Sequence, residues 1–344
     1  MGDPLENLSE SIDFEQFRSM IEAARPKQDK DPKKGGRPPF DAVLMWKMTL
    51  LQEWYGISND SVEYQVNDRL SFQRFLGLGL DDKVPDANTL WDFKEMLANS
   101  ETDKKLFQFF TEQMEESEII TRKGSIVDAT FAHAPKQRNS RDDNKKIKEG
   151  EMPEHWLPSD DDDDATKAKK ANRLSQKDTD ARWTKKGNET HFGYKDHVKV
   201  DAGSKMIVTF EVTPASTHDS QTFVALLDEK DDVVNADSAY VGEELEAEIR
   251  AKLDDPETDK KITLNINEKA YRNKPLTDEQ KTSNREKNRI RARVEHVFGI
   301  MHVSMGEFII RTIGMVRAKA SIARRNLAYN MKRFVFLTNK PKTA

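Results

Sequence analysis

The sequence contains no cysteine, and this absence excludes several kinds of chemistry. Disulfide bonds, zinc sites built on thiolates and thiol catalysis all need that residue, although its absence leaves the redox compartment open. No apolar run approaches the roughly 20 residues that a membrane-spanning helix needs. The first residues, MGDPLENLSESIDFEQF, are acidic and have no apolar centre, so they do not resemble a secretory signal. We therefore expect a cytoplasmic protein without a membrane partner.

The chain also lacks an overall basic charge, since its net charge is −5 over 344 residues. The cations are unevenly spread, however. Residues 281–333 hold 13 Lys and Arg against 3 Glu, and residues 165–205 hold 11 against 5 acidic residues. A basic stripe within an acidic chain is typical of nucleic-acid binding, although a solvated charged surface gives the same count. Charge alone leaves both interpretations open.

The first third of the chain has the pattern of short helices. Residues 1–34 predict one amphipathic helix followed by a polar linker. Helix-capping residues precede three apolar helical patterns: Asp41, Ser58 and Asp86. Gly56 ends the first of these helices, the second runs to about Leu70, and a further helix covers residues 107–119. Residues 35–120 therefore predict a helical domain, either for DNA-end binding and dimerisation or as a plain scaffold.

After residue 120 the pattern changes to short β-branched segments separated by Gly, Asp or Pro. These segments cover residues 124–131, 197–203, 206–215, 232–240 and 262–267. Helical patterns lie between the later ones, and a long helix follows the last. This order predicts an α/β domain over residues 121–338, with helices packed on a mixed sheet.

Residues 135–180 interrupt this pattern without visible periodicity. They include the run DDDDD at 160–164. Neighbouring aspartates repel one another and point in different directions, so this run predicts solvated acid rather than a metal site. We expect an excursion loop with little core of its own.

Three carboxylates stand where a sheet could bring them together. Asp128 and Asp237 lie at the ends of two predicted strands, and Glu295 lies on the long final helix. If the two strands are neighbours and parallel, both aspartates lie at the same edge of the sheet. Mg²⁺ and Mn²⁺ prefer oxygen ligands and keep positions open for water and phosphate. The three acids are therefore candidate ligands of two such ions.

The helix around Glu295 can be tested by its geometry. At about 100° per residue, four apolar residues fall on one face, which we expect to be buried: Ile290, Val294, Val297 and Met301. Beside that face, Glu295 shares an arc with Asn288, Arg291 and His302. Arg289 and Arg293 lie on the remaining flank, where they could meet DNA phosphates. The alternative role of Glu295 is an ordinary ion pair with Arg291 on the helix surface.

The segment HFGYKDH mixes aromatic and basic side chains. His191, Tyr194 and Lys195 within it are candidate contacts with phosphates or bases of DNA, because aromatic and basic groups together bind single-stranded nucleic acid. An ordinary strand is the alternative.

Several other residues have structural interpretations. Asp201 predicts a hairpin-turn residue, and Asp219 predicts a helix cap with a metal-ligand role as the alternative. We expect ordinary hydrogen-bonded roles for His133 and His218. The tryptophans that we expect in the core are Trp46, Trp54 and Trp91.

Several blocks of the sequence together resemble a known family. They are GGRPPFDAVLMWKMTLLQEWYGIS, VPDANTLWDFKEML, GSIVDATFAHAP, TKKGNETHFGYKDHVKVDAGS, VTPASTHDS, ADSAYVG and IRARVEHVFG. In this order they resemble the DDE transposases of bacterial and archaeal insertion sequences, specifically the "insertion sequence five" group. The likeness spans residues 35 to 336. It implies an RNase H-like catalytic domain with Asp128, Asp237 and Glu295 as its metal-binding triad, preceded by an all-helical domain that binds the element ends.

The resemblance has two departures in the family's Tyr-Arg-Glu-Lys signature. Arg291 matches its arginine and Glu295 its glutamate. Asn288 stands at the tyrosine position and His302 at the lysine position. Both family residues are implied to contact DNA, so these departures concern the DNA ends rather than the metal ligands.

The function that the resemblance implies is DNA transposition by metal-dependent phosphoryl transfer. The enzyme would cleave the element's terminal inverted repeats and join the 3′-OH to target DNA, as a homodimer associated with the prokaryotic nucleoid. Two alternatives stay open: another RNase H-fold DNA nuclease, or an inactive DNA-binding remnant of an element.

Overall fold

The chain begins with helices whose ends are set by its own capping residues. The computed structural model describes residues 2–26, 38–254, 260–270 and 275–339. The helices before the sheet are α1 (Pro4–Ser11), α2 (Arg18–Ala23), α3 (Ala42–Tyr55), α4 (Asn59–Asp68), α5 (Leu70–Leu76), α6 (Ala87–Asn99) and α7 (Thr102–Glu116), with a 3₁₀ turn η1 (Phe14–Phe17). The Asp41 carboxylate accepts the Val43 and Leu44 N–H groups, and Gly56 ends α3 in the left-handed conformation. Both ends of α3 are as predicted.

The other two predicted caps are also confirmed. Ser58 accepts the Ser61 N–H at the start of α4, and Asp86 accepts the Thr89 N–H at the start of α6. The second helix is shorter than predicted. Its backbone becomes extended at Arg69, and α5 begins at the next residue.

Six strands form one mixed sheet. They are β1 (Ser125–His133), β2 (Arg182–Lys186), β3 (Glu189–Asp201), β4 (Ile207–Pro214), β5 (Val233–Ala236) and β6 (Thr263–Ile266). The order is β2-β3-β1-β5-β6, and β4 also pairs with β3. Strand β3 is long enough for β2 and β4 to pair with successive parts of one edge while β1 pairs with the other. The pairs among β1 to β4 are antiparallel, whereas β5 and β6 continue the sheet in parallel with β1.

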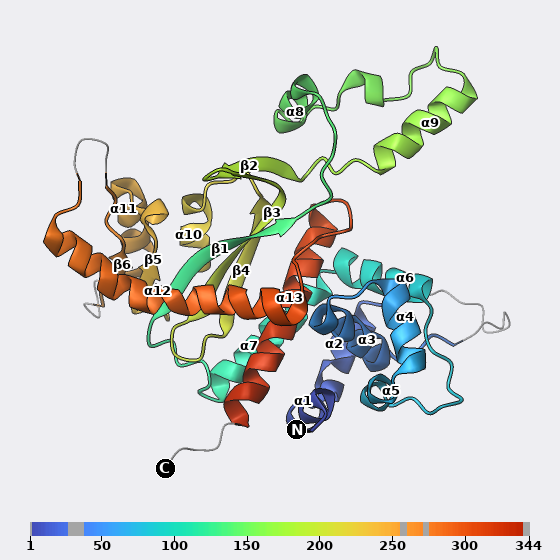
Figure 1. Cartoon of the computed structure of the whole chain (residues 1–344), viewed down its shortest axis with the longest axis horizontal. Coiled ribbons are helices and arrows are strands. Elements are labelled where there is room, and N and C mark those ends of the chain that lie inside the picture. Colours follow the sequence, from blue (N-terminus) through green and yellow to red (C-terminus); the bar gives the residue numbers. More distant parts are fainter. Residues whose placement is uncertain (1, 27–37, 255–259, 271–274, 340–344) are drawn as a thin grey trace.

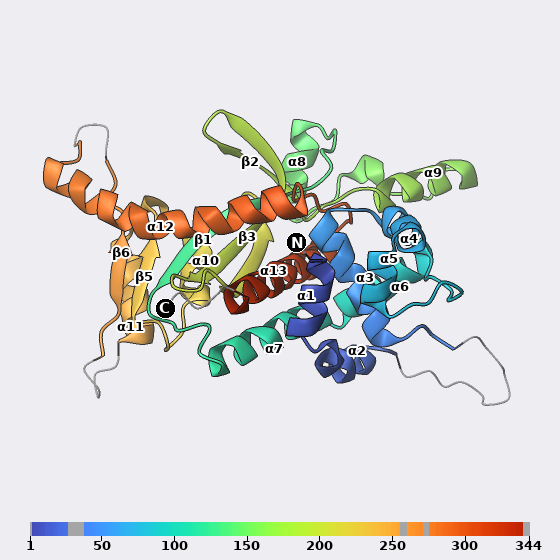
Figure 2. The same cartoon turned by 60° about the horizontal axis from the view of Figure 1, so that its bottom comes forward.

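Helices cover both faces of this sheet (Figures 1 and 2). On one face, α10 (Ser220–Leu226) and α11 (Glu243–Leu253) pack against Val127 and Val234 with a short 3₁₀ turn, η3 (Ser238–Tyr240). On the other, α12 (Asp278–Met305) crosses the strands, and α13 (Met315–Thr338) packs between β4 and the N-terminal helices. The predicted α/β class, with helices flanking a mixed sheet, is confirmed.

The N-terminal helices and the sheet share one hydrophobic core. Buried side chains run without a break from Leu5 on α1, through Trp46 on α3, to Val198 on β3 and Leu327 on α13. Trp54 joins the two parts directly, because its indole N–H donates to the Ala328 carbonyl at 2.9 Å. The divisions at residues 34 and 120 stay a prediction, and the packing shows that the helical segment does not bury its core alone.

The excursion between β1 and β2 was expected to be an irregular loop, and this prediction is wrong. It contains α8 (Arg141–Lys148), a 3₁₀ turn η2 (Glu154–Trp156) and α9 (Asp164–Ser175), which project from the body as an arm (Figure 1). Trp156 is buried within it beneath the Lys177 ammonium. Asp163 in the aspartate run accepts the Thr166 N–H and so caps α9. Because α9 buries none of its residues, it has no apolar stripe from which a helix could be predicted.

None of the helices in the described part of the chain combines the length and apolar character that a membrane crossing requires.

Candidate active site

The two aspartates of the predicted triad stand side by side on neighbouring strands. Asp237 directly follows β5, as predicted, whereas Asp128 lies inside β1 and not at its end, so that part of the prediction is wrong. Strands β1 and β5 are neighbours and run parallel, with Ser125 opposite Val234 and Ile126 opposite Asn235. Continuing this register by two residues places Asp128 beside Asp237, which directly follows β5. The two strands are therefore parallel neighbours, which was the condition for the two aspartates to lie close together.

Glu295 reaches the same region of the sheet from α12, which packs on β1 and β5. The buried face of this helix includes Val294, Val297 and Met301, and Ile290 is packed against the same core, as the helical geometry predicted. Glu295 lies beside this face with an exposed side chain. The packing of α12 thus places the glutamate in the same pocket as the two aspartates without burying it.

The three carboxylates line a single pocket of about 390 Å³, which we call the acidic pocket. Its other lining residues are Ala129, Thr130, Phe131, Lys186, Glu189, His191, Arg291 and Phe298. Four acidic side chains, the three candidates and Glu189 of β3, therefore meet in one place, together with two cations and two phenylalanines.

Asp128 is the most enclosed of the three acids. Burial raises the pKa of its carboxyl group, and the negative charge of Asp237 adds to this effect, whereas the Ala129 N–H and Arg291 oppose it. An Nη2 atom of Arg291 lies 3.4 Å from Asp128 Oδ2. Within the described residues Arg291 thus pairs with Asp128 across the site and not with Glu295 along the helix. The surface ion pair that was the alternative role of Glu295 is not formed.

The donor set suits a hard divalent cation by its chemistry, because carboxylate oxygens are the ligands that Mg²⁺ and Mn²⁺ prefer. In this structure the carboxylate groups are spaced more widely than the ligands of one metal ion. Among the residues that the structure describes, no three His, Asp or Glu side chains converge as ligands of one ion. Arg291 supplies the positive charge beside Asp128. Binding of ions would require that contact to open and the exposed Glu295 side chain to turn inward.

The predicted DNA contacts on β3 have different environments. His191 lies in the acidic pocket and stacks on Phe131, with ring centroids 4.0 Å apart. Its Nδ1 is 3.0 Å from His133 Nε2. Lys195 is on the same face of the strand, but its Nζ donates to Asp219 Oδ1 at 2.8 Å and to the Thr217 carbonyl at 2.7 Å. An incoming phosphate would have to compete with both partners.

Tyr194 cannot take the predicted role, and this prediction is corrected. The side chain is fully buried, and its hydroxyl donates to Asp178 at 2.8 Å. Side chains alternate between the two faces of a strand, so the residue between Gly193 and Lys195 points into the core. Because polar and apolar residues do not alternate regularly in HFGYKDH, the sequence did not show which of its side chains face the core.

The remaining predicted DNA contacts lie along α12. Arg289 and His302 are exposed, whereas Arg293 donates to the Ala202 carbonyl at 2.5 Å. Asn288 accepts hydrogen bonds from Asn267 Nδ2 at 2.7 Å and from Arg291 at 3.3 Å. Asn288 therefore holds the guanidinium that pairs with Asp128.

Two residues near the site were not found from the sequence. Lys186 lies in the acidic pocket, at the end of β2. Tyr240 is buried next to β5, and its hydroxyl has no partner among the described residues. Burial and the charges of Asp219, Asp128 and Asp237 raise the pKa of that hydroxyl. Neither residue has a sequence signal beyond its closeness to a strand end.

The structural interpretations of the other residues mostly hold. Asp201 accepts the Ser204 N–H at 2.6 Å within the β3–β4 turn, and His218 contacts the Ser220 hydroxyl at 2.8 Å. Asp219 precedes α10 but makes no capping hydrogen bond, so that prediction is wrong. The core positions of Trp46 and Trp54 are confirmed, whereas Trp91 is 40% exposed.

Two transposase families match the chain. The family described as "Transposase DDE domain" matches residues 120–331, which include all six strands and most of α13. The family described as "Transposase domain (DUF772)" matches residues 1–96, which include α1 to α5 and most of α6. Among solved structures, the chain is similar to a piggyBac transposase in a synaptic complex with hairpin DNA, at 10% identity over 100% of this chain and 83% of that one. Their TM-score of 0.39 is too low to establish a shared fold. Because the DDE match covers more than half of the sequence, the chain belongs to the DDE transposase family.

Proposed function

We propose that this DDE transposase is the DNA transposase of an insertion sequence of the "insertion sequence five" group. It cleaves the ends of its element and joins the freed 3′-OH to target DNA. Asp128, Asp237 and Glu295 are its metal ligands. The observation that carries the proposal is that these three acids, far apart in the sequence, line one pocket within the DDE match. The quoted sequence blocks support the choice of group.

The topology supports an RNase H-like catalytic domain. An antiparallel unit of β1, β3 and β4 continues into the parallel strands β5 and β6, and the candidate acids stand at the β1–β5 junction and on the helix that crosses it. This is the arrangement that we expect of such a domain, with β2 and the arm as additions to it.

The residues of the acidic pocket have different roles in the proposed reaction. Asp128, Asp237 and Glu295 would hold divalent ions, which would supply a lowered pKa to an attacking water or 3′-OH and stabilise the leaving oxygen. Arg291, which neutralises Asp128 in this structure, is then free to bind a phosphate of the DNA, and Asn288 orients it. Lys186 adds a second positive charge.

The DNA partners follow from this reaction. The enzyme binds the terminal inverted repeats of the element and the target DNA, with Arg289, His302 and His191 as contacts near the pocket. The N-terminal helices contribute to end binding, and a homodimer holds two ends together. The basic segment 281–333, which contains most of α12 and most of α13, supports the DNA role.

A nicking and joining assay on DNA that carries the element ends tests the proposal. The wild-type chain should cleave the ends only with Mg²⁺ or Mn²⁺ present and should then join them to a target. Asp237→Asn should abolish both steps and leave end binding intact. Asp232→Asn is the matched control, because Asp232 is exposed near β5 and pairs only with Lys260 among the described residues.

The products also separate the alternatives. A nuclease of another kind would cleave without joining, and an inactive remnant would bind without cleaving. Cleavage that persists in Asp237→Asn would contradict the assignment of the second acid.

A further inference from the structure

A chain of adjoining pockets leads away from the acidic pocket. The next one, the middle pocket of about 200 Å³, shares Thr130, Phe131 and Phe298 with it. A third, the distal pocket of about 380 Å³, shares Glu307, Phe308 and Arg325 with the middle one. Because neighbouring pockets have lining residues in common, the three lie next to one another in a row, which we call the groove. It runs from the candidate metal ligands to the junction between the N-terminal helices and α13.

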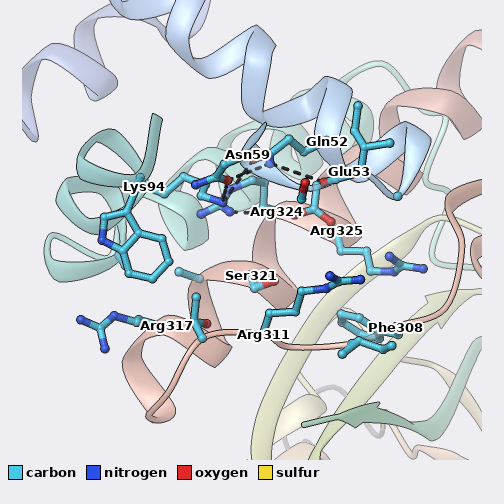
Figure 3. Close-up of a pocket in the computed structure, with 18 of the residues that line it drawn as sticks. Gln52, Glu53, Asn59, Lys94, Phe308, Arg311, Arg317, Ser321, Arg324 and Arg325 are labelled. Atoms are coloured by element: carbon cyan, nitrogen blue, oxygen red, sulfur yellow. Dashed lines mark hydrogen bonds and ion pairs between the residues drawn. The ribbon is translucent and has the colours of Figure 1, made fainter. Parts of the chain in front are cut away.

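The distal pocket has two sides of different character (Figure 3). On one side, Lys94 donates to Asn59 at 2.7 Å and to Gln52 at 3.2 Å. On the other side, the segment after α12 and the start of α13 bring Arg311 and Arg317 into the wall. The DDE match does not extend to α3 and α6, so this pocket is shared between the two matched families.

Two of the arginines that line the distal pocket, Arg311 and Arg325, have unused hydrogen-bonding capacity, whereas the other two are paired with acids. Arg324 pairs with Asp103 at 3.0 Å and Arg317 with Glu95 at 2.6 Å. Arg311, in contrast, is exposed and pairs with no acid among the described residues. Arg325 is only 4% exposed, yet its Nε has no partner there, and its guanidinium lies 4.5 Å from the Phe308 ring centroid. The terminal nitrogens of Arg325 donate to the carbonyls of Met301, Met305 and Gly306, so its unpartnered Nε and the exposed Arg311 are the donors that an anionic ligand in the groove could use.

Aromatic side chains follow the groove along its length. Phe131 and Phe298 separate the acidic and middle pockets, Phe308 separates the middle and distal ones, and Trp91 lines the distal one. Trp91 is 40% exposed, with the Arg317 guanidinium 5.8 Å from its ring centroid. Paired bases in a duplex have both faces covered by their neighbours. Aromatic groups alternating with cations therefore suit an unpaired strand, whose bases have free faces.

We propose that this groove binds an unpaired strand of the DNA that enters the acidic pocket, with a base stacked on Trp91 and a phosphate at Arg311 and Arg325. This inference rests on the proposed function. Glu295 and His302 are seven residues apart on α12, a rise of about 10 Å, which matches about three stacked nucleotides at 3.4 Å each. The nucleotide in the distal pocket is thus at least three positions away from the reacting phosphate.

Binding of the full chain to two probes tests the proposal. One probe is a blunt duplex of the element end, and the other carries a single-stranded extension of about six nucleotides, which is long enough to pass the middle pocket. Both are measured by fluorescence anisotropy in EDTA, so that no cleavage occurs. The wild-type chain should prefer the extended probe by at least about fivefold, the lower limit for one stacked base. Extensions on the 5′ and 3′ strands are tested separately, and a preference for either supports the groove.

Three variants then test which residues cause the preference for the extended probe. Trp91→Ala should weaken binding of the extended probe by about 5- to 150-fold and leave the blunt probe unchanged. Arg311→Ala should lower the slope of log K against log salt by about 0.7 for the extended probe alone. Lys319→Ala is the control, because it removes an exposed cation of α13 that does not line the groove and should change neither probe.

The outcomes separate this proposal from the proposed function. Equal wild-type binding of both probes, or equal weakening of both by Trp91→Ala and Arg311→Ala, would overturn the groove. Asp237→Asn should lose cleavage yet keep the preference for the extended probe. Arg311 is exposed, so its variant provides a test that does not depend on the packing of Trp91.

Discussion

Asp196 allows the buried centre of the fold to be tested through pH. This residue of β3 is 0% exposed, and Asn326 Nδ2 donates to its Oδ1 at 3.3 Å. Its Oδ2 has no partner among the described residues. Burial raises the pKa of this carboxyl group from its ordinary 3.8 to about 7, against the opposing effects of Asn326 and Arg325.

The sign of the resulting pH dependence follows from proton binding. Between these two pKa values the folded chain holds a proton that the unfolded chain has released. Stability from this group is therefore full at low pH and declines as pH rises through that range. At 1.36 kcal/mol per pKa unit, the decline between about pH 5 and about pH 8 amounts to about 2.5 kcal/mol. Asp196→Asn removes the titration and keeps both a donor and an acceptor.

Urea unfolding of both proteins at the two pH values measures this difference. The free energy of unfolding of Asp196→Asn relative to wild type should rise by about 2.5 kcal/mol from the lower pH to the higher. Asp232→Asn, at an exposed position, serves as the control and should show almost no change. If the Asp196→Asn difference is the same at both pH values, Asp196 ionises as in the unfolded chain, and its buried position is refuted.

Three further substitutions test other parts of the structure by their free energies of unfolding. Gly193→Ala should destabilise the fold by about 3 kcal/mol, because the added Cβ collides with the Ala132 carbonyl at a φ of +145°; tolerance of alanine would contradict the β1–β3 register. Gly299→Ala should instead stabilise it by about 0.5 to 1 kcal/mol, since that helical position is open; a loss would show that α12 lies closer to a neighbour. Lys199→Met should cost about 3 kcal/mol, because the buried Asp231 carboxylate loses the ammonium at 2.7 Å and keeps, among the described residues, only the Arg122 guanidinium as a cation, at 3.9 Å. Adding Asp231→Asn should recover part of this loss, and no recovery would argue against the pair.

Local signals account for the parts of the fold that could be predicted. The caps Asp41 and Asp86 and the terminal Gly56 act through hydrogen bonds and backbone conformation within a few residues, so they can be read from the sequence. The buried face of α12 follows in the same way from helical periodicity. These signals marked Asp128, Asp237 and Glu295 as candidates, and the resemblance to the DDE transposases implied that they act together; the three line one pocket.

Tertiary contacts explain the errors. Tyr194 is turned into the core by its place on β3, and Asp219 is drawn from a capping position toward Lys195. Trp91 is exposed because α6 presents it to the distal pocket, which is lined by segments far apart in the chain. The helices of the arm lie outside the main core, so they leave no apolar periodicity in the sequence.

Anomalous diffraction from crystals of the enzyme with Mn²⁺ and uncleaved end DNA would test the central account most directly. We predict one or two metal peaks in the acidic pocket, with carboxylate oxygens of Asp128, Asp237 and Glu295 among their ligands at about 2.1 Å. The Arg291 guanidinium should have left Asp128 for a phosphate. Metal peaks held by other residues, or a Glu295 carboxylate that stays out of reach of every ion, would contradict the account.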